Sequence, residues 1–250
     1  MPALAPDQVN SLLVNKLIQS LVVECTNVAQ VVVHAGSRVG ADDGSIVMEV
    51  PSNITVDITA SGANGLDTGA EAADTWYYLW LIFNPTTEVV AGLLSTSPTS
   101  PTMPSGYTKK RLISAVRNVS TDFNAFLQRD NFVDANVRVL FTGIALPSAS
   151  WYQTDASTLI PLSLSRTLIA TTNLLHTTAV AVSAWGKAGT GASSSHEYRL
   201  CHVPDGILND QLYDMYVRCL TDENGAISCY ATNSNNTTGA VVAGYVLDLL

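Results

Sequence analysis

The pattern of apolar and polar positions predicts β-strands, and its centre is Trp76–Phe83, where eight consecutive residues are apolar or aromatic. A run this short and this rich in aromatic residues is typical of a strand covered on both faces. Because side chains alternate along a strand, one face carries Trp76, Tyr78, Trp80 and Ile82, and the other carries Tyr77, Leu79, Leu81 and Phe83. Turn-forming residues at 84–88 and a second apolar stretch, Val89–Leu94, complete a predicted hairpin.

Further stretches with strand periodicity follow along the chain. They are residues 31–35, 46–50, 54–59, 110–118, 137–144, 159–164, 177–185, 196–203, 211–221, 226–232 and 240–249. Asn224-Gly225, which separates two of them, predicts a hairpin. Strands at about ten-residue spacing without helical patterns between them indicate sandwiches or jelly rolls. The expected fold class is all-β, with two jelly-roll-like β-sandwich domains at 28–147 and 148–250, divided where small polar residues interrupt the strand pattern.

Residues 1–27 differ from the rest and are expected to form a short N-terminal arm or helix. Residues spaced by three and four predict an amphipathic helix suited to anchoring or oligomerisation; they include Val9, Leu12, Leu13, Leu17 and Leu21. A weaker alternation over Leu17–Cys25 leaves a strand as the alternative.

Composition and charge narrow the class of function. The 250 residues are 47% hydrophobic and only 13% charged, against about 25% charged in average proteins, which suits a hydroxyl-rich surface or burial in an assembly. The net charge of −9 argues against a nucleic-acid partner, because phosphate binding needs clustered Lys and Arg, and the one basic cluster is residues 109–111. No apolar run reaches the ~18 residues of a membrane span, and no leader pattern is visible, so we expect no membrane partner and a cytoplasmic site of synthesis.

One motif matches catalytic chemistry. Leu66-Asp67-Thr68-Gly69-Ala70 has the signature of retroviral and pepsin-like aspartic proteases, which need two such aspartates sharing a proton. Here the motif follows a loop instead of an apolar strand, and Leu140-Phe141-Thr142-Gly143 matches the later protease element poorly. We therefore expect Asp67 to form a turn, and we expect no enzyme.

Other residues capable of chemistry fit structural roles better. His34, His176, His196 and His202, with Cys201, lack the tight ligand spacing of zinc sites, and the carboxylates Asp42, Asp43, Asp67, Glu71 and Asp74 lack that of calcium loops. Cys25, Cys201, Cys219 and Cys229 show no CxxC spacing and are expected to remain thiols. No phosphate loop or cofactor fingerprint is present, so no metal or cofactor is expected. The candidates for stacking on a sugar, with core or interface packing as the alternative, are the aromatic residues Trp151, Tyr152, Trp185, Tyr213 and Tyr216.

Several short motifs occur together in the central stretch. They are Gly65-Leu66-Asp67-Thr68-Gly69, Thr75-Trp76-Tyr77-Tyr78, Leu94-Ser95-Thr96-Ser97, and Pro101-Thr102-Met103-Pro104-Ser105-Gly106-Tyr107 with Arg111, joined at the end of the chain by Ala240-Val241-Val242-Ala243-Gly244-Tyr245. This set resembles a module of tailed-bacteriophage virion proteins, particularly tail-fibre and related appendage proteins, over about residues 30–145 and the last strand. The resemblance implies a β-rich, usually trimeric structural protein without catalytic residues.

The expected function is therefore a structural subunit of a phage particle, in a fibre, a capsid decoration or a tail-associated part, and displayed for host attachment. We expect a homotrimer that contacts other virion proteins through its N-terminal segment and is assembled in the host bacterial cytoplasm. A glycan-binding receptor-recognition protein is the alternative. A second alternative is an enzyme, either the aspartic protease or a polysaccharide-degrading appendage.

Overall fold

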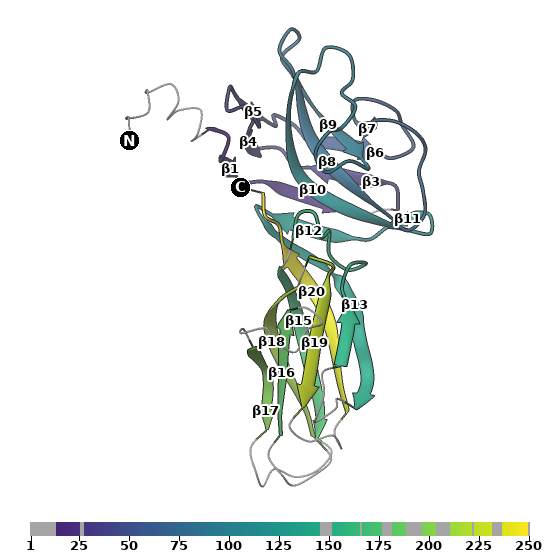
Figure 1. Ribbon diagram of the computed structural model, residues 1–250. Helices are drawn as coiled ribbons and strands as arrows, with labels where there is room; N and C mark the ends of the chain where they lie inside the picture. The colour runs from purple at the N-terminus through teal and green to yellow at the C-terminus, as the bar shows by residue number, and fades with distance from the viewer. Residues whose placement is uncertain are drawn as a thin grey trace, which may run out of the picture. The chain divides into compact units, whose positions relative to one another are not determined.

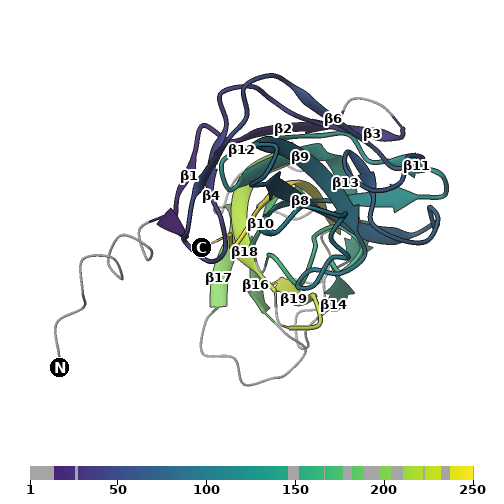
Figure 2. The same cartoon turned by 90° about the horizontal axis from the view of Figure 1, so that it is seen from above.

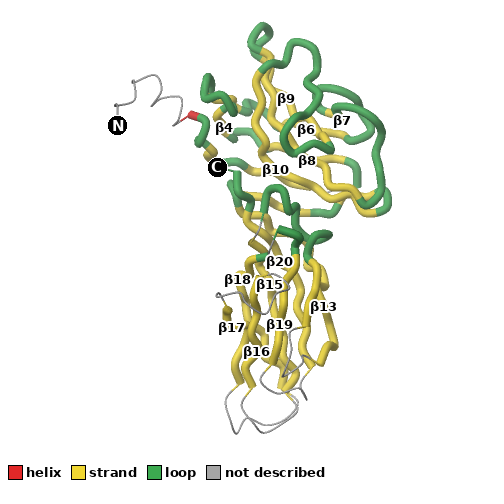
Figure 3. Tube along the Cα trace, in the orientation of Figure 1, coloured by secondary structure: helices red, strands yellow, loops and turns green. Residues whose placement is uncertain are grey.

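The structure is a computed structural model that describes residues 14–25, 28–145, 152–165, 167–176, 182–188, 197–203, 211–221, 223–231 and 237–249 (Figure 1). Strands are its regular elements, apart from the single helical residue Val14 (Figure 3). The predicted all-β fold class is confirmed. Within the described residues, no helix is long and apolar enough to span a membrane. The chain divides into two compact units, Met1–Val133 with Leu249–Leu250, and Asp134–Asp248, so the second is inserted into the first.

In the part of it that the structure describes, the first unit contains twelve strands and the start of a thirteenth. They are β1 (Ile18–Gln19), β2 (Val22–Cys25), β3 (Gln30–Val33), β4 (Arg38–Gly40), β5 (Val47–Glu49), β6 (Ile54–Asp57), β7 (Gly65–Leu66), β8 (Thr75–Asn84), β9 (Val89–Ser95), β10 (Lys109–Val119), β11 (Asp122–Phe123), β12 (Phe126–Arg129) and β13 (Phe132–Ala145). Three groups of hydrogen-bonded neighbours result, in the orders β11-β10-β8-β9-β7, β12-β2-β3-β6 and β1-β4-β5. Figure 2 shows β2, β3 and β6 as one layer and β8 and β9 as the next.

The core of this unit lies between these two layers. Tyr77, Leu79 and Leu81 of β8 are at most 1% exposed, and Val31 and Val33 of β3 are fully buried. The layers meet closely at Gly92 of β9, where an added Cβ would lie 2.2 Å from Cγ2 of Val56 in β6. Tyrosine, leucine and valine side chains at period two therefore fill a sandwich interior.

The hairpin predicted around Trp76–Phe83 is confirmed. β8 pairs antiparallel with β9, from Tyr78 opposite Ser95 to Asn84 opposite Val89. The two predicted faces are also present: Lys110 and Arg117 lie over the rings of Trp80 and Trp76, whereas Tyr77 contacts Phe123 on the other face.

The helix predicted in the N-terminal segment is wrong over residues 18–25, where the strand alternative is correct. Residues 1–13 and 26–27 lie outside the described residues. β2 pairs with β12 on one side and β3 on the other. Leu21, Val23 and Cys25 are buried at period two, so partners on both sides selected the strand pattern over the helical one. The role of the segment in anchoring stays a prediction.

Among its described residues, the second unit contains seven further strands beside the remainder of β13. They are β14 (Tyr152–Asp155), β15 (Thr167–His176), β16 (Val182–Ala188), β17 (Glu197–Val203), β18 (Gln211–Leu220), β19 (Ala226–Ala231) and β20 (Thr237–Val246). They pair in the orders β18-β15-β20-β13 and β14-β19-β16-β17. Residues 159–164, predicted as a strand, form turns, and β15 was missed. The predicted domain boundary at 147–150 lies outside the described residues.

The hairpin predicted at Asn224-Gly225 is also wrong. The turn exists, with Gly225 at φ +82°, but β18 pairs with β15 while β19 pairs with β14 and β16. The carbonyl of Gly225 accepts a hydrogen bond from the amide of Ala156, 2.9 Å away, which directs the chain into the other sheet. A turn signal fixes the local reversal, but it does not fix which strand becomes the neighbour.

Candidate functional site

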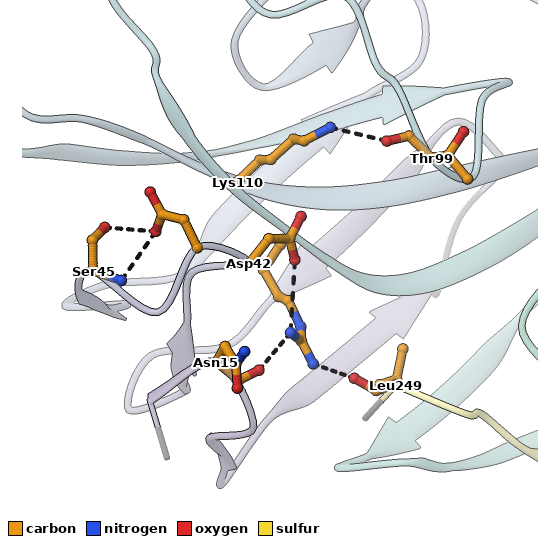
Figure 4. A network of polar contacts seen from close by, with 8 residues as sticks. Asn15, Asp42, Ser45, Thr99, Lys110 and Leu249 are labelled. Atoms are coloured by element: carbon orange, nitrogen blue, oxygen red, sulfur yellow. Dashed lines mark hydrogen bonds and ion pairs between the residues drawn. The ribbon is translucent and has the colours of Figure 1, made fainter. Parts of the chain in front are cut away.

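Three of the motifs that carry the phage resemblance, those at 65–69, 94–97 and 101–107, meet at one segment, residues 96–108, which we call the strap. It connects β9 to β10, the two neighbours of β8. The indole nitrogen of Trp80 donates to the carbonyl of Ser97 at 3.2 Å. Nζ of Lys110 lies 4.7 Å from the centre of the Trp80 ring and donates to the carbonyl of Thr99 at 2.9 Å (Figure 4). The strap therefore covers the Trp80 face of β8, and Trp80 is only 3% exposed.

Asp67, the aspartate of the protease-like motif, fastens the strap. Its Oδ2 accepts a hydrogen bond from the amide of Thr102 at 2.9 Å, and its Oδ1 accepts one from the amide of Thr68 at 2.7 Å. The amide of Asp67 itself donates to the carbonyl of Leu94 at 2.8 Å. Gly69 follows at φ +81°, a left-handed conformation that favours glycine. Both carboxylate oxygens thus serve main-chain amides, which is the chemistry of a loop clamp.

The strap presents hydroxyl groups outward. Its prolines recur at every third position, Pro98, Pro101 and Pro104. Pro101 is buried, and the other two are partly buried. The exposed residues of the strap include Thr99, Ser100, Thr102 and Ser105. The result is a displayed hydroxyl surface on a fixed backbone.

A second set of contacts holds the loop between β7 and β8. Nδ2 of the fully buried Asn118 donates to Oε1 of Glu71 and to the carbonyl of Ala72, both at 2.9 Å. The amide of Ala72 donates to the hydroxyl of Tyr77 at 2.7 Å. Glu71 and Asp67 therefore hold different partners. In the part of the chain that the structure describes, no group of three or more His, Cys, Asp or Glu residues is arranged to hold a metal ion.

Arg111 of β10 joins segments from both ends of the chain, as Figure 4 shows around Asn15, Asp42 and Leu249. Its guanidinium donates to the carbonyls of Asn15 and Leu249 and lies 3.6 Å from Oδ1 of Asp42. The Arg111 side chain is 11% exposed. Burial lowers the pKa of Arg111 and raises that of Asp42, and the attraction between the two charges opposes both shifts. The carbonyl partners lie 96 and 138 residues away in sequence, so no local pattern could have revealed them.

The predicted sugar-stacking residues are not brought together by any described contact. Trp151 lies outside the described residues. Tyr152 is partly buried in β14, opposite Cys229. Trp185, Tyr213 and Tyr216 lie on β16 and β18, but their side chains are not described. Their role in binding a ligand stays a prediction.

The candidate metal ligands and thiols are only partly described. His34 Nε2 lies 3.0 Å from Oε2 of Glu24, so it pairs with a carboxylate. His196 lies outside the described residues, as do the side chains of His176, His202, Cys201, Cys219 and Cys229. Cys25 is buried, as predicted for it.

Comparison with known proteins gives little. No protein-family model matches the chain, and no curated protein matches it. Two solved structures are aligned over 99% of this chain and 75% of theirs: the VP2 subviral particle of infectious bursal disease virus, at 13% identity and a TM-score of 0.25, and infectious bursal disease virus strain Gx, at 12% and 0.24. Scores this low support no argument about fold or function.

Proposed function

We propose that this chain is a structural subunit of a virus particle, of the kind that tailed bacteriophages use in fibres, capsid decorations or tail-associated parts. It acts by symmetric assembly and surface display, without catalysis. The observation that carries the proposal is the strap. Asp67 and Thr102 belong to two of the motifs that resemble phage virion proteins and lie 35 residues apart in sequence, yet together with Trp80 they fix a hydroxyl-rich loop on a sheet.

The chemistry of Asp67 supports display over proteolysis. The catalytic aspartate of an aspartic protease must share a proton with a second aspartate and meet a substrate. Asp67 instead accepts main-chain hydrogen bonds from two residues of its own chain. Low charge supports assembly, because a chain with only 13% charged residues buries fewer hydrated charges when subunits pack together.

The proposed assembly is a homotrimer held through the N-terminal segment, which also contacts other virion proteins. Light scattering of the purified full chain tests it, with an expected mass near three times 26.5 kDa. A chain that begins at Ser20 lacks β1 and all that precedes it but keeps β2, and it should be monomeric with an unchanged circular dichroism spectrum. A full chain that is monomeric at every concentration contradicts the proposed assembly.

A further inference from the structure

In the first unit, residues 14–19, a turn at 14–17 followed by β1, lie against the edge of β4, and we call the residues that contact them, Arg38–Gly40 and Arg111, the seat. Ile18 and Gln19 of β1 pair with Val39 and Arg38 of β4. The amide of Gly40 donates to the carbonyl of Leu17 at 2.9 Å. β1 is thus a short strand added to the edge of β4 and β5.

Two features of the seat recognise the backbone of the segment. A Cβ on Gly40 would lie 1.6 Å from the carbonyl oxygen of Val14, so only glycine permits this approach. The largely buried Arg111 donates to the carbonyl of Asn15. Neither contact depends on the side chains of the segment.

The segment is joined to the rest of the chain at a strained residue. Ser20 has φ +54°, a left-handed conformation that is unfavourable for residues other than glycine. The next residue, Leu21, is fully buried and is held by Asp130. The amide of Leu21 donates to Oδ1 of Asp130 at 3.0 Å, and the amide of Asp130 donates to the carbonyl of Leu21 at 2.7 Å. Movement of β1 would therefore pivot at Ser20 and leave β2 in place.

We propose that residues 14–19 are exchanged between copies of this chain, so that the β1 of one subunit occupies the β4 seat of the next. The occupant, a second copy, rests on the proposed function of symmetric assembly. The seat contacts are the same whichever copy supplies the segment, so the difference between the two forms lies at the hinge. In the exchanged form, an extended φ at Ser20 relieves the left-handed strain. Such an exchange creates an interface from contacts that the single subunit already makes with its own segment.

A disulfide between Gln19→Cys and Arg38→Cys in the full chain distinguishes the two forms. These residues lie directly opposite each other, and both are exposed, so the pair has cross-strand spacing suited to a disulfide. After mild oxidation, exchange gives covalent oligomers on a non-reducing denaturing gel, whereas a segment seated in its own subunit gives a monomer band. The two single-cysteine variants, oxidised in parallel, control for the native cysteines.

Substitutions at the hinge test the mechanism in the same double-cysteine chain. Ser20→Pro forbids a positive φ and should raise the ratio of intermolecular to intramolecular disulfide by at least about fivefold. Ser20→Gly removes the strain and should lower that ratio by a similar factor. Light scattering of each sample before oxidation measures assembly separately.

The outcomes separate this inference from the proposed function. Oligomers by light scattering with intermolecular disulfides that respond to the hinge substitutions support exchange. Oligomers with only intramolecular disulfides in all three hinge forms overturn exchange and leave the proposed function intact. A monomeric full chain at every concentration overturns both.

Discussion

The clamp made by Asp67 gives the sharpest test of a structural role against a catalytic one. Asp67→Asn keeps the shape of the side chain but leaves one oxygen where there were two. That oxygen can still accept from the amide of Thr68, which lies 2.7 Å away in the native protein. The new NH2 group then faces the amide of Thr102, and two donors meet where a 2.9 Å hydrogen bond was made.

The expected loss follows from this single bond. A hydrogen bond to a charged group contributes about 1.5–3 kcal/mol. Thr102 is exposed and Asp67 is only partly buried, so water replaces part of the interaction. We therefore expect a loss of about 1–2 kcal/mol in the free energy of unfolding of the first unit, or about 2–8 °C in Tm.

Urea unfolding and hydrogen exchange measure the effect. The amide of Thr102 should lose its protection in Asp67→Asn. Asp74→Asn is the matched control: its side chain is 72% exposed and 3.7 Å from Arg117, so it should change stability by less than about 0.5 kcal/mol. Unchanged stability and unchanged Thr102 exchange would refute the clamp, and a peptidase activity abolished by Asp67→Asn would restore the protease hypothesis.

Three further predictions concern packing and charge in the first unit. Gly92→Ala should destabilise it by about 1–3 kcal/mol through overlap with Val56, and Val56→Ala should cost less in that background than alone, as a double-mutant cycle in urea would show. Titration followed by carbon NMR should show the pKa values of Asp42 and Asp43 displaced in opposite directions from the ordinary value of 3.8. Hydrogen bonds from Lys109 and Ser45 lower the pKa of Asp43 to about 2, whereas burial raises the pKa of Asp42. Asp43 therefore adds stability above pH 3.8, and this stability is lost as pH falls through about 2. Asp42 instead favours the fold below pH 3.8, and this effect is lost as pH rises through its folded pKa. Shifts of the two pKa values in the same direction would contradict this prediction. Arg111→Met removes the donor to two carbonyls, so it should lower the free energy of unfolding in urea by about 2–3 kcal/mol. It should also raise the pKa of Asp42 further, and an unchanged pKa of Asp42 would contradict the ion pair between Arg111 and Asp42.

Strand content and the facing of side chains were open to prediction from sequence. Period-two alternation is a local property, so the two faces of Trp76–Phe83 follow from the order of residues alone. The N-terminal segment carried two periods at once, and the strand won over residues 18–25 because β12 and β3 lie on both sides of β2. Asn224-Gly225 predicted a reversal correctly, but not that the strands on either side join different sheets.

The candidate site was predictable only in part. The protease-like match drew attention to Asp67, and its turn role followed from the loop before it, but its partner Thr102 lies 35 residues away. Arg111 was assigned only to the basic cluster 109–111 and to a phage-like motif, and its contacts could not be predicted because the carbonyls that it holds lie near opposite ends of the chain. Hydrogen bonds between residues far apart in the chain produce no recognisable spacing pattern in the sequence.

The sequence by itself determined an all-β chain of low charge, its central hairpin and the turn at Asp67, because periodicity, composition and turn chemistry are local. Only the tertiary structure decided which strands are neighbours, that Asp67 clamps the strap, and that Arg111 holds the carbonyls of Asn15 and Leu249. These depend on contacts between distant segments. Such contacts form only when burial of the shared core brings the segments together.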